Sequence, residues 1–347
     1  MEIREIIKKQ EIEGAMDLVW LVFQQFEAPD YSPEGITTFK DFIEAQRIQP
    51  TLSLYGAYAK DMLIGMIATR SNGGHISLFF VKKEYHGQGI GRSLFNHICS
   101  QYDHPSITVN SSPYAAEIYR KLGFADLGSE QVTDGLRYIP MEYHAKAQQT
   151  IKQLKKNNMA GYYVHDSKQL LRLLSDLIPP GTTVGSGDSV TLEQAGVFEF
   201  LRNGDYNFLD KFAPTLTREE KRQIYLRNFT ADTFITGTSA VTKDGKLFNI
   251  DGNGSRVAPM LYGPEQVIVV VGVNKLTDNV DEAVLRTRQT AAPLDAQRLG
   301  KETPCVTLGR CIDCNHKQRI CNDFVLITGQ FSKDRIKVII INEELGY

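Results

Sequence analysis

Val81-Lys-Lys-Glu-Tyr-His-Gly-Gln-Gly-Ile-Gly-Arg92 joins an apolar run that predicts a strand to an amphipathic run that predicts a helix. Glycines let the backbone approach an anion with no Cβ in the way, and a helix N-terminus presents unpaired N–H groups and a positive dipole end. The segment therefore has the outline of a pyrophosphate cradle. A tight strand-to-helix connection also needs glycine for its backbone angles, so the glycines alone leave both interpretations open.

Alternating helices and strands are predicted on both sides of this turn. Apolar spacing predicts helices at residues 6–25, 37–46, 91–102 and 113–122, and strands at residues 52–59, 63–70, 74–81, 106–110 and 136–143. The first part of the chain is thus expected to be an α/β domain.

The glycine-rich turn resembles motif A of the GNAT superfamily of N-acetyltransferases, which reads Gln/Arg-x-x-Gly-x-Gly/Ala after a strand ending in Val. Gly89 and Gly91 match this pattern, whereas His86 stands where Gln or Arg is usual. Further on, Asn110-Ser-Ser-Pro-Tyr-Ala-Ala-Glu-Ile-Tyr119-Arg-Lys-Leu-Gly-Phe124 resembles motif B, an Asn followed by a helix ending in Tyr-x-Lys-x-Gly-Phe. The resemblance implies a GNAT fold at residues 1–144, with a mixed, mostly antiparallel sheet and flanking helices.

The resemblance also implies acetyl transfer from acetyl-CoA to a small-molecule amine by direct attack. It assigns the backbone of the strand to the pantetheine arm and the turn to the diphosphate. The implied cofactor-binding residues are Phe79, Phe80, Val81, His86, Gly87, Gln88, Gly89, Ile90, Gly91, Arg92 and Asn110. Tyr119 matches the family tyrosine that protonates the departing sulfur; the alternative is a tyrosine that only packs under the following turn.

The general base is open in the sequence. Many members of the superfamily carry a Glu on the strand before motif A, where this chain has His75 and Ser77. His75 is one candidate, because an unperturbed imidazole titrates near pH 6.5. Glu27, in the segment Glu27-Ala-Pro-Asp-Tyr31 that resembles one branch of the superfamily, is the other.

Length and charge limit the remaining function classes. A chain of 347 residues is long enough for about two domains of ordinary size. Its 39 Lys+Arg against 41 Asp+Glu give a net charge of -2, too balanced for a protein held to nucleic acid by its overall field. No apolar run is long enough to span a bilayer, and the N-terminus lacks the pattern of a signal peptide, so a cytoplasmic location is expected. The oligomeric state cannot be inferred.

A second domain is predicted at residues 145–347, beginning with a polar Lys/Gln-rich segment. Its pattern predicts an α/β domain with a largely parallel sheet. Helices are expected at residues 161–177, 190–201, 218–228 and 280–292, and strands at residues 182–185, 233–236, 245–250 and 267–273, with a terminal strand pair at 324–328 and 336–342.

This second region resembles the LUD (lactate-utilisation) family, which is related in fold to sugar-phosphate isomerases and CoA transferases. The matching segments are Val184-Gly-Ser-Gly-Asp-Ser, Thr236-Gly-Thr-Ser-Ala, Asp251-Gly-Asn-Gly-Ser-Arg256, Gly272-Val-Asn-Lys275 and Thr303-Pro-Cys305. Loops of this kind can gather around a phosphate or carboxylate, with Arg256 as a bidentate donor; simple turns are the alternative. Glu193 and Asp251 are candidate site carboxylates, although a cap or turn role is favoured for each. For Asp188 or Ser189, capping of the following helix is the favoured role.

Four of the five cysteines cluster near the C-terminus, as Cys305, Cys311, Cys314 and Cys321. Four thiols so close in sequence suit tetrahedral zinc or an iron–sulfur cluster, and His316 is able to replace one ligand. Free or redox-active thiols are the alternative.

The sequence thus predicts an acetyl-CoA-dependent N-acetyltransferase fused to a LUD domain of undefined role. One alternative is a non-catalytic CoA-binding or sensor module whose metal- or redox-linked LUD domain acts in lactate or organic-acid metabolism. Another makes the whole chain a metal-dependent redox component.

Overall fold

The computed structural model describes residues 1–102 and 104–347, which form two compact units, Met1–Ala145 and Lys146–Tyr347. Each unit encloses its own apolar core. None of the helices in the described residues is long and apolar enough to cross a membrane.

The N-terminal unit contains one mixed sheet in the order β1-β2-β3-β4-β5-β8-β6, with β7 paired to β8. Its strands are β1 (Glu2–Glu5), β2 (Ser53–Ala59), β3 (Met62–Arg70), β4 (His75–Val81), β5 (Ser106–Ser111), β6 (Ala125–Asp126), β7 (Gln131–Thr133) and β8 (Leu136–His144). Among the strand pairs that the described residues form in this unit, only β4–β5 is parallel. This confirms the expected mixed, mostly antiparallel sheet.

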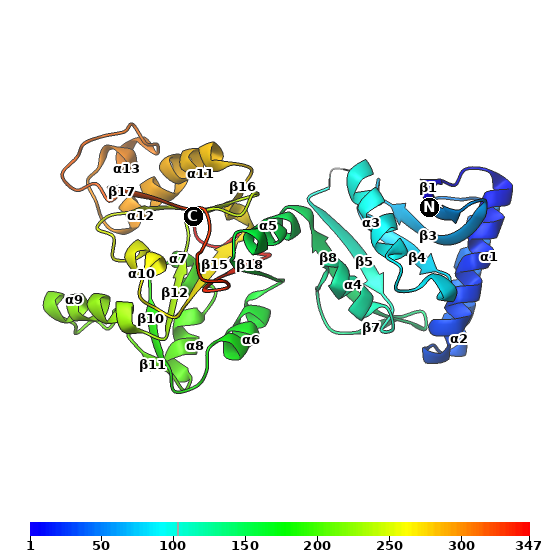
Figure 1. The fold of residues 1–347 in the computed structure, drawn as a ribbon, viewed down its shortest axis with the longest axis horizontal. Helices are drawn as coiled ribbons and strands as arrows, with labels where there is room; N and C mark the ends of the chain where they lie inside the picture. The colour runs from blue at the N-terminus through cyan, green and yellow to red at the C-terminus, as the bar shows by residue number, and fades with distance from the viewer. Residues whose placement is uncertain (103) are drawn as a thin grey trace. The chain divides into compact units, whose positions relative to one another are not determined.

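Helices cover both faces of this sheet (Figure 1). They are α1 (Lys9–Phe26), α2 (Pro33–Ile48), α3 (Ile90–Gln101) and α4 (Ala116–Leu122), with short 3-10 turns at Ala28–Asp30 and Lys83–Tyr85. Because side chains alternate along a strand, β4 supplies both cores. Leu78 and Phe80 pack in the cluster with α1, whereas Phe79 and Val81, on the opposite face, pack against the cluster with α3.

The parallel strands β4 and β5 part after two residue pairs. His75 pairs with Thr108 and Ile76 with Val109, but β4 continues to Val81 without a partner on that side. The sheet therefore opens between the C-terminal halves of the two strands, and the peptide groups of β4 along this opening have no neighbouring strand.

The C-terminal unit is built on a six-stranded sheet in which every pair is parallel, in the order β11-β10-β12-β15-β18-β9. Its strands are β9 (Ala160–Val164), β10 (Thr183–Ser186), β11 (Asn207–Phe208), β12 (Thr233–Gly237), β15 (Gln266–Gly272) and β18 (Ile336–Ile341). The run Val267–Val271 is buried on both faces, as expected for a central parallel strand. The predicted largely parallel sheet is confirmed.

A second sheet of this unit has the order β16-β13-β14-β17. Its strands are β13 (Ala240–Thr242), β14 (Leu247–Asp251), β16 (Leu276–Thr277) and β17 (Asp323–Ile327). The helices are α5 (Ala145–Lys156), α6 (Ser167–Leu177), α7 (Val190–Gln194), α8 (Val197–Asn203), α9 (Arg218–Arg227), α10 (Val257–Leu261), α11 (Val280–Arg286), α12 (Ala292–Arg298) and α13 (Pro304–Leu308). Short 3-10 turns lie at Asn228–Thr230 and Val273–Lys275, and a π-turn at Thr287–Ala291 joins α11 to α12.

Several predicted elements of this unit were wrong. The segment expected to begin a helix at residue 161 is instead β9, which pairs with β18 at the sheet edge. The helix predicted at residues 190–201 is divided, because Gly196 adopts a left-handed φ of 72° between α7 and α8. The two terminal strands do not pair with each other; β17 pairs with β14 and β18 with β15 and β9.

Candidate functional site

The glycine-rich turn after β4 presents a row of open backbone N–H groups. Gly87 and Gly89 have φ of 76° and 80°, and Gly89 is the N-cap of α3. No N–H group of residues 87–92 has an acceptor among the described residues. A Cβ added at Gly87 or Gly89 would meet nothing within 4 Å. This arrangement fits an anion such as a diphosphate at the start of a helix.

The side chains of the same turn hold its backbone in place. His86 Nε2 lies 2.8 Å from the carbonyl oxygen of Val81, so this nitrogen must carry the proton and donate it. Gln88 donates to the carbonyl of Glu84 at 3.0 Å, and Arg92 donates to the carbonyl of Lys121 at 3.0 Å. Ile90 is buried in the core. An anion here would therefore be held mainly by backbone groups.

The opening between β4 and β5 leads into a cavity of about 380 Å³. Among its lining residues are six that the sequence predicted, Glu27, His75, Phe79, Phe80, Asn110 and Tyr119. Val81 does not line it, and its carbonyl is occupied by His86. The structure thus brings together the predicted acid, both predicted bases and much of the predicted strand.

Glu27 ends α1 and reaches this cavity as a partly buried carboxyl. Burial raises the pKa of Glu27 to about 7, although a hydrogen bond from Ser112 opposes part of that rise. A carboxyl with a pKa near 7 is divided between a proton acceptor and a proton donor at neutral pH, as a general base requires.

His75 lies at the start of β4, where its Nδ1 atom is 2.8 Å from Thr108 Oγ1. Burial, aided by the charge of Arg70, lowers the pKa of His75 to about 4. An imidazole with so low a pKa stays neutral at pH 7 and holds a proton weakly. His75 is therefore a poorer proton acceptor than Glu27.

Tyr119 projects from α4 into the same cavity and is 6% exposed. Its ring packs edge-on against Phe79 and Phe124, with centroid distances of 5.9 Å and 5.1 Å. Its hydroxyl has no hydrogen-bond partner among the described residues. Burial, followed by the charge of Glu27, raises the pKa of Tyr119 above its usual range, so that the phenol keeps its proton.

Two further residues of this site were not predicted. Ser112, two residues after Asn110 in the motif B segment, supplies the hydrogen bond to Glu27. Tyr31 lines the cavity and donates through its hydroxyl to the carbonyl of Arg137 at 2.8 Å. Ser112 belongs to the segment that resembles motif B and Tyr31 to the segment that begins with Glu27, but the sequence did not show that both contribute to the surroundings of Glu27.

The C-terminal unit contains its own cavity of about 650 Å³. Asp251 and Arg256 line it, whereas Glu193 is not among the lining residues. Arg256 donates to Asn249 Oδ1 at 2.6 Å and to the carbonyls of Ile250 and Gly237 at 2.8 and 3.2 Å. The guanidinium of Arg256 is therefore mostly occupied by the protein, and its role as a bidentate anion donor stays a prediction. Ser189 caps α7, as the sequence predicted, by accepting from the Leu192 N–H.

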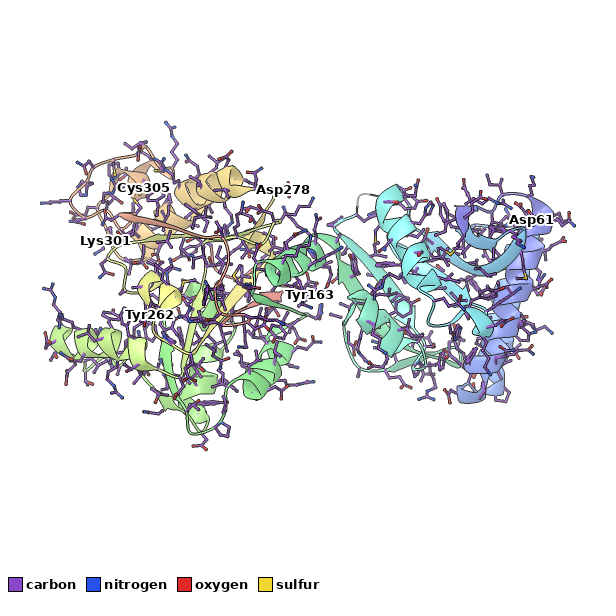
Figure 2. All side chains as sticks on the ribbon, in the orientation of Figure 1. Asp61, Tyr163, Tyr262, Asp278, Lys301 and Cys305 are labelled. Carbon is purple, nitrogen blue, oxygen red and sulfur yellow. The ribbon has the colours of Figure 1, made fainter. Side chains whose placement is uncertain are left out.

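The four clustered cysteines line one small cavity of about 20 Å³ as free thiols. Cys305 in α13 is labelled in Figure 2, as is Lys301, which precedes this helix and lines the larger cavity. Within the described residues, no group of three or more His, Cys, Asp or Glu side chains is arranged to hold a metal ion. Cys311 instead accepts from Arg288 and from the Asp313 N–H. The donor set as folded does not fit zinc or an iron–sulfur cluster.

Comparison with known families divides the chain as its fold does. Residues 147–341 match the model of the LUD domain, and residues 27–145 match that of the Acetyltransferase (GNAT) domain. No curated protein matches the chain.

Solved structures similar to part of this chain include the following three proteins, each of which is matched over nearly its whole length. A GCN5-related N-acetyltransferase from Rhodopseudomonas palustris is 19% identical, covering 41% of this chain and 94% of its own, with a TM-score of 0.36. YjaB from Escherichia coli is 23% identical, covering 41% of this chain and 96% of its own, with a TM-score of 0.35. The PaiA N-acetyltransferase from Thermoplasma acidophilum, solved with coenzyme A, is 20% identical and covers 42% of this chain and 99% of its own, with a TM-score of 0.31.

Proposed function

The chain belongs to the LUD domain family and also carries an N-terminal GNAT acetyltransferase domain, and we propose that the GNAT domain moves acetyl from acetyl-CoA to a small-molecule amine. The observation that carries the proposal is the turn at residues 87–92, whose N–H groups have no acceptor in the described part of the chain. This turn follows β4, the strand that borders the β4–β5 opening. Acetyl-CoA would supply an activated thioester there, with its diphosphate at the turn.

Glu27 is proposed as the general base. An amine attacks a thioester only when unprotonated, and most amines are ammonium ions at neutral pH. The Glu27 carboxylate would take the ammonium proton, directly or through one water, because its pKa of about 7 leaves much of it ionised at that pH. The pKa of His75, about 4, argues against the imidazole in that role.

Tyr119 is proposed as the general acid. Attack forms a C–N bond and breaks the C–S bond, so the departing sulfur needs a proton. The hydroxyl of Tyr119 retains its proton, lines the cavity and has no other hydrogen-bond partner among the described residues. Its ring packs against Phe79 on the strand that borders the opening, which supports a position near the bond that breaks.

The cavity walls support an acceptor amine attached to an apolar body. Eight aromatic side chains contribute to them: Phe23, Tyr31, Phe39, Phe42, Phe79, Phe80, Tyr119 and Tyr138. Aromatic faces attract a cation and bury apolar groups. We therefore favour arylalkyl or alkyl amines over highly hydroxylated ones.

Thiol release from acetyl-CoA in the presence of an amine panel tests the proposal. We expect turnover with at least one apolar primary amine, and its loss in Glu27→Gln. The alternative function, a CoA sensor without catalysis, draws on the absence of a carboxylate from β4, where the sequence has His75 and Ser77. Tight binding of coenzyme A without turnover of any amine would favour the sensor. Failure of coenzyme A to bind at millimolar concentration would contradict both.

A further inference from the structure

The larger cavity of the C-terminal unit lies at the carboxyl ends of its parallel strands. The residues that follow β10, β12 and β15 all contribute to its wall, among them Ser189, Thr238 and Lys275. In open parallel sheets, small molecules bind at this edge. The volume of about 650 Å³ is sufficient for a small organic ligand.

Positive charge exceeds negative charge around this cavity. Three arginines and three lysines line it against three aspartates: Arg256, Arg298, Arg319, Lys275, Lys301, Lys317, Asp188, Asp251 and Asp295. Each aspartate already faces an arginine. Asp251 lies 3.7 Å from Arg256, and Asp188 and Asp295 lie 3.6 and 2.8 Å from Arg298. None of the three lysines has a carboxylate partner within 4.0 Å among the described residues.

Lys275 is the most deeply buried of these lysines, at 4% exposure. Within the described part of the chain its Nζ atom makes one hydrogen bond, a donation to Thr191 Oγ1 at 2.7 Å. The Thr191 hydroxyl donates onward to the carbonyl of Leu345 at 3.1 Å. An ammonium has three protons to donate, so Lys275 retains donors for a ligand in the cavity it lines. Burial lowers the pKa of Lys275 to about 7, as expected for a cation without a counter-ion.

Lys211 is a second buried lysine beside the same space. It is 7% exposed, and its Nζ atom lies over the rings of Phe212 and Tyr225, at 5.2 and 5.4 Å, without a hydrogen bond to any described residue. Tyr225 lines the cavity. The charges that act on Lys211 are those of Asp188, Arg256, Asp251 and Arg298, all of which line it too.

A charge buried without a partner is expensive, so such a group either loses its charge or needs a partner, and an anion bound in the cavity would supply that partner. We propose that this cavity binds a small hydroxylated organic anion whose carboxylate or phosphate group lies at Lys275, with the charge of Lys211 adding to the attraction. Polar walls that include Ser239, Asn253 and Gln318 suit the hydroxyl groups of such a ligand. This site is separate from the acetyl-transfer site and does not depend on the proposed transferase activity.

Calorimetric titration of the full chain with glycerate, glycerol 3-phosphate and glycerol tests the proposal. The three probes share hydroxyl groups and differ in bearing a carboxylate, a phosphate or no charge. We expect one or both anions to bind and glycerol not to bind; the anion that binds more tightly identifies the charged group. Lys275→Met should weaken that binding at least about tenfold, the usual worth of a hydrogen bond to a charged group.

Lys337→Met is the matched control, because Lys337 is a half-buried lysine of β18 that donates to the carbonyl of Asp334 and does not line the cavity. It should bind the anion like the wild-type chain. If Lys275→Met does not fold, Lys211→Met provides the same comparison. The proposal is wrong if neither anion binds at millimolar concentration, if glycerol binds equally well, or if the folded lysine variants bind the anion unchanged. Binding unchanged in these variants would point to the turn at residues 87–92 instead.

Discussion

Glu27, at the end of α1, and Tyr119, in α4, line one cavity, and the charge of Glu27 acts on Tyr119. Burial is the first cause of the raised pKa of Tyr119, and the charge of Glu27 is the second. An ionised Glu27 therefore helps to keep Tyr119 protonated. This relationship lets one cavity hold a proton acceptor and a proton donor at the same pH, as acyl transfer to an amine requires.

Tyr119→Phe should lower kcat about 100-fold while leaving the KM for acetyl-CoA nearly unchanged, because a general acid acts in the transition state. The phenyl ring keeps the contacts with Phe79 and Phe124. Steady-state kinetics with a saturating amine measure this. Tyr143→Phe is the control, since Tyr143 also contacts Phe124 but does not line the cavity. Equal losses in kcat and in acetyl-CoA affinity would indicate that Tyr119 has only a packing role.

The pH dependence of kcat should report the ionisation of Glu27. A base must be unprotonated, so activity should rise with pH through a midpoint of about 7, the pKa of Glu27. Glu27→Gln should lose about 100-fold in kcat and lose this rising limb. A rising limb that persists unchanged in Glu27→Gln would assign the titration to another group.

The same carboxyl should make stability depend on pH. Its pKa is higher in the folded protein than the ordinary 4.5, so the folded state holds the proton more tightly. Stability is then greatest below pH 4.5 and declines as pH rises through 7. Glu27→Gln should therefore stabilise the N-terminal unit more at pH 8 than at pH 5, by roughly 1–3 kcal/mol. Urea unfolding followed by the fluorescence of Trp20, the one tryptophan, provides the measurement. An equal effect at both pH values would contradict the assignment.

Gly89→Ala should weaken coenzyme A binding at least about tenfold, because its Cβ would enter the space before the open N–H groups. The left-handed φ of 80° also strains any side chain there. Gly181→Ala is the matched control, with φ of 76° and equally open surroundings but no place in the turn. Calorimetry with coenzyme A separates the two variants. Similar weakening in both would show that strain, rather than the ligand, is responsible.

Arg319→Met should expose the cysteine segment. Arg319 donates to the carbonyls of Cys314 and Cys321 at 2.8 and 2.7 Å and thereby holds residues 314 and 321 of this segment together. Without these bonds, the clustered thiols should react with a disulfide reagent several-fold faster in the native protein. Lys317→Met is the control, because Lys317 belongs to the same segment and has no ion pair among the described residues. Unchanged reaction rates would mean that the loop is held by other contacts.

Sequence patterns predicted the features that depend on residues close together in the chain. Both fold classes were predicted and are confirmed, because the apolar spacing of helices and strands and the glycine turn at residues 87–91 are local properties. The bounds of β4 and α3 could be predicted to within one residue without knowledge of contacts to distant parts of the chain. The roles assigned to Tyr119, Glu27 and the CoA-binding turn stay predictions until the variants are measured.

The sequence by itself determined which chemical groups were available: the carboxyl of Glu27, the phenol of Tyr119, the glycine-rich turn and Lys275, to which the sequence assigned no role. Only the tertiary structure decided their environments, because pKa values and pairing depend on burial and on neighbours far along the chain. It lowered the pKa of His75 and raised that of Glu27, occupied Arg256 with oxygen atoms of the protein, and left Lys275 without a counter-ion among the described residues. It also placed β17 and β18 in different sheets, since strand pairing over long separations follows from packing and not from local pattern.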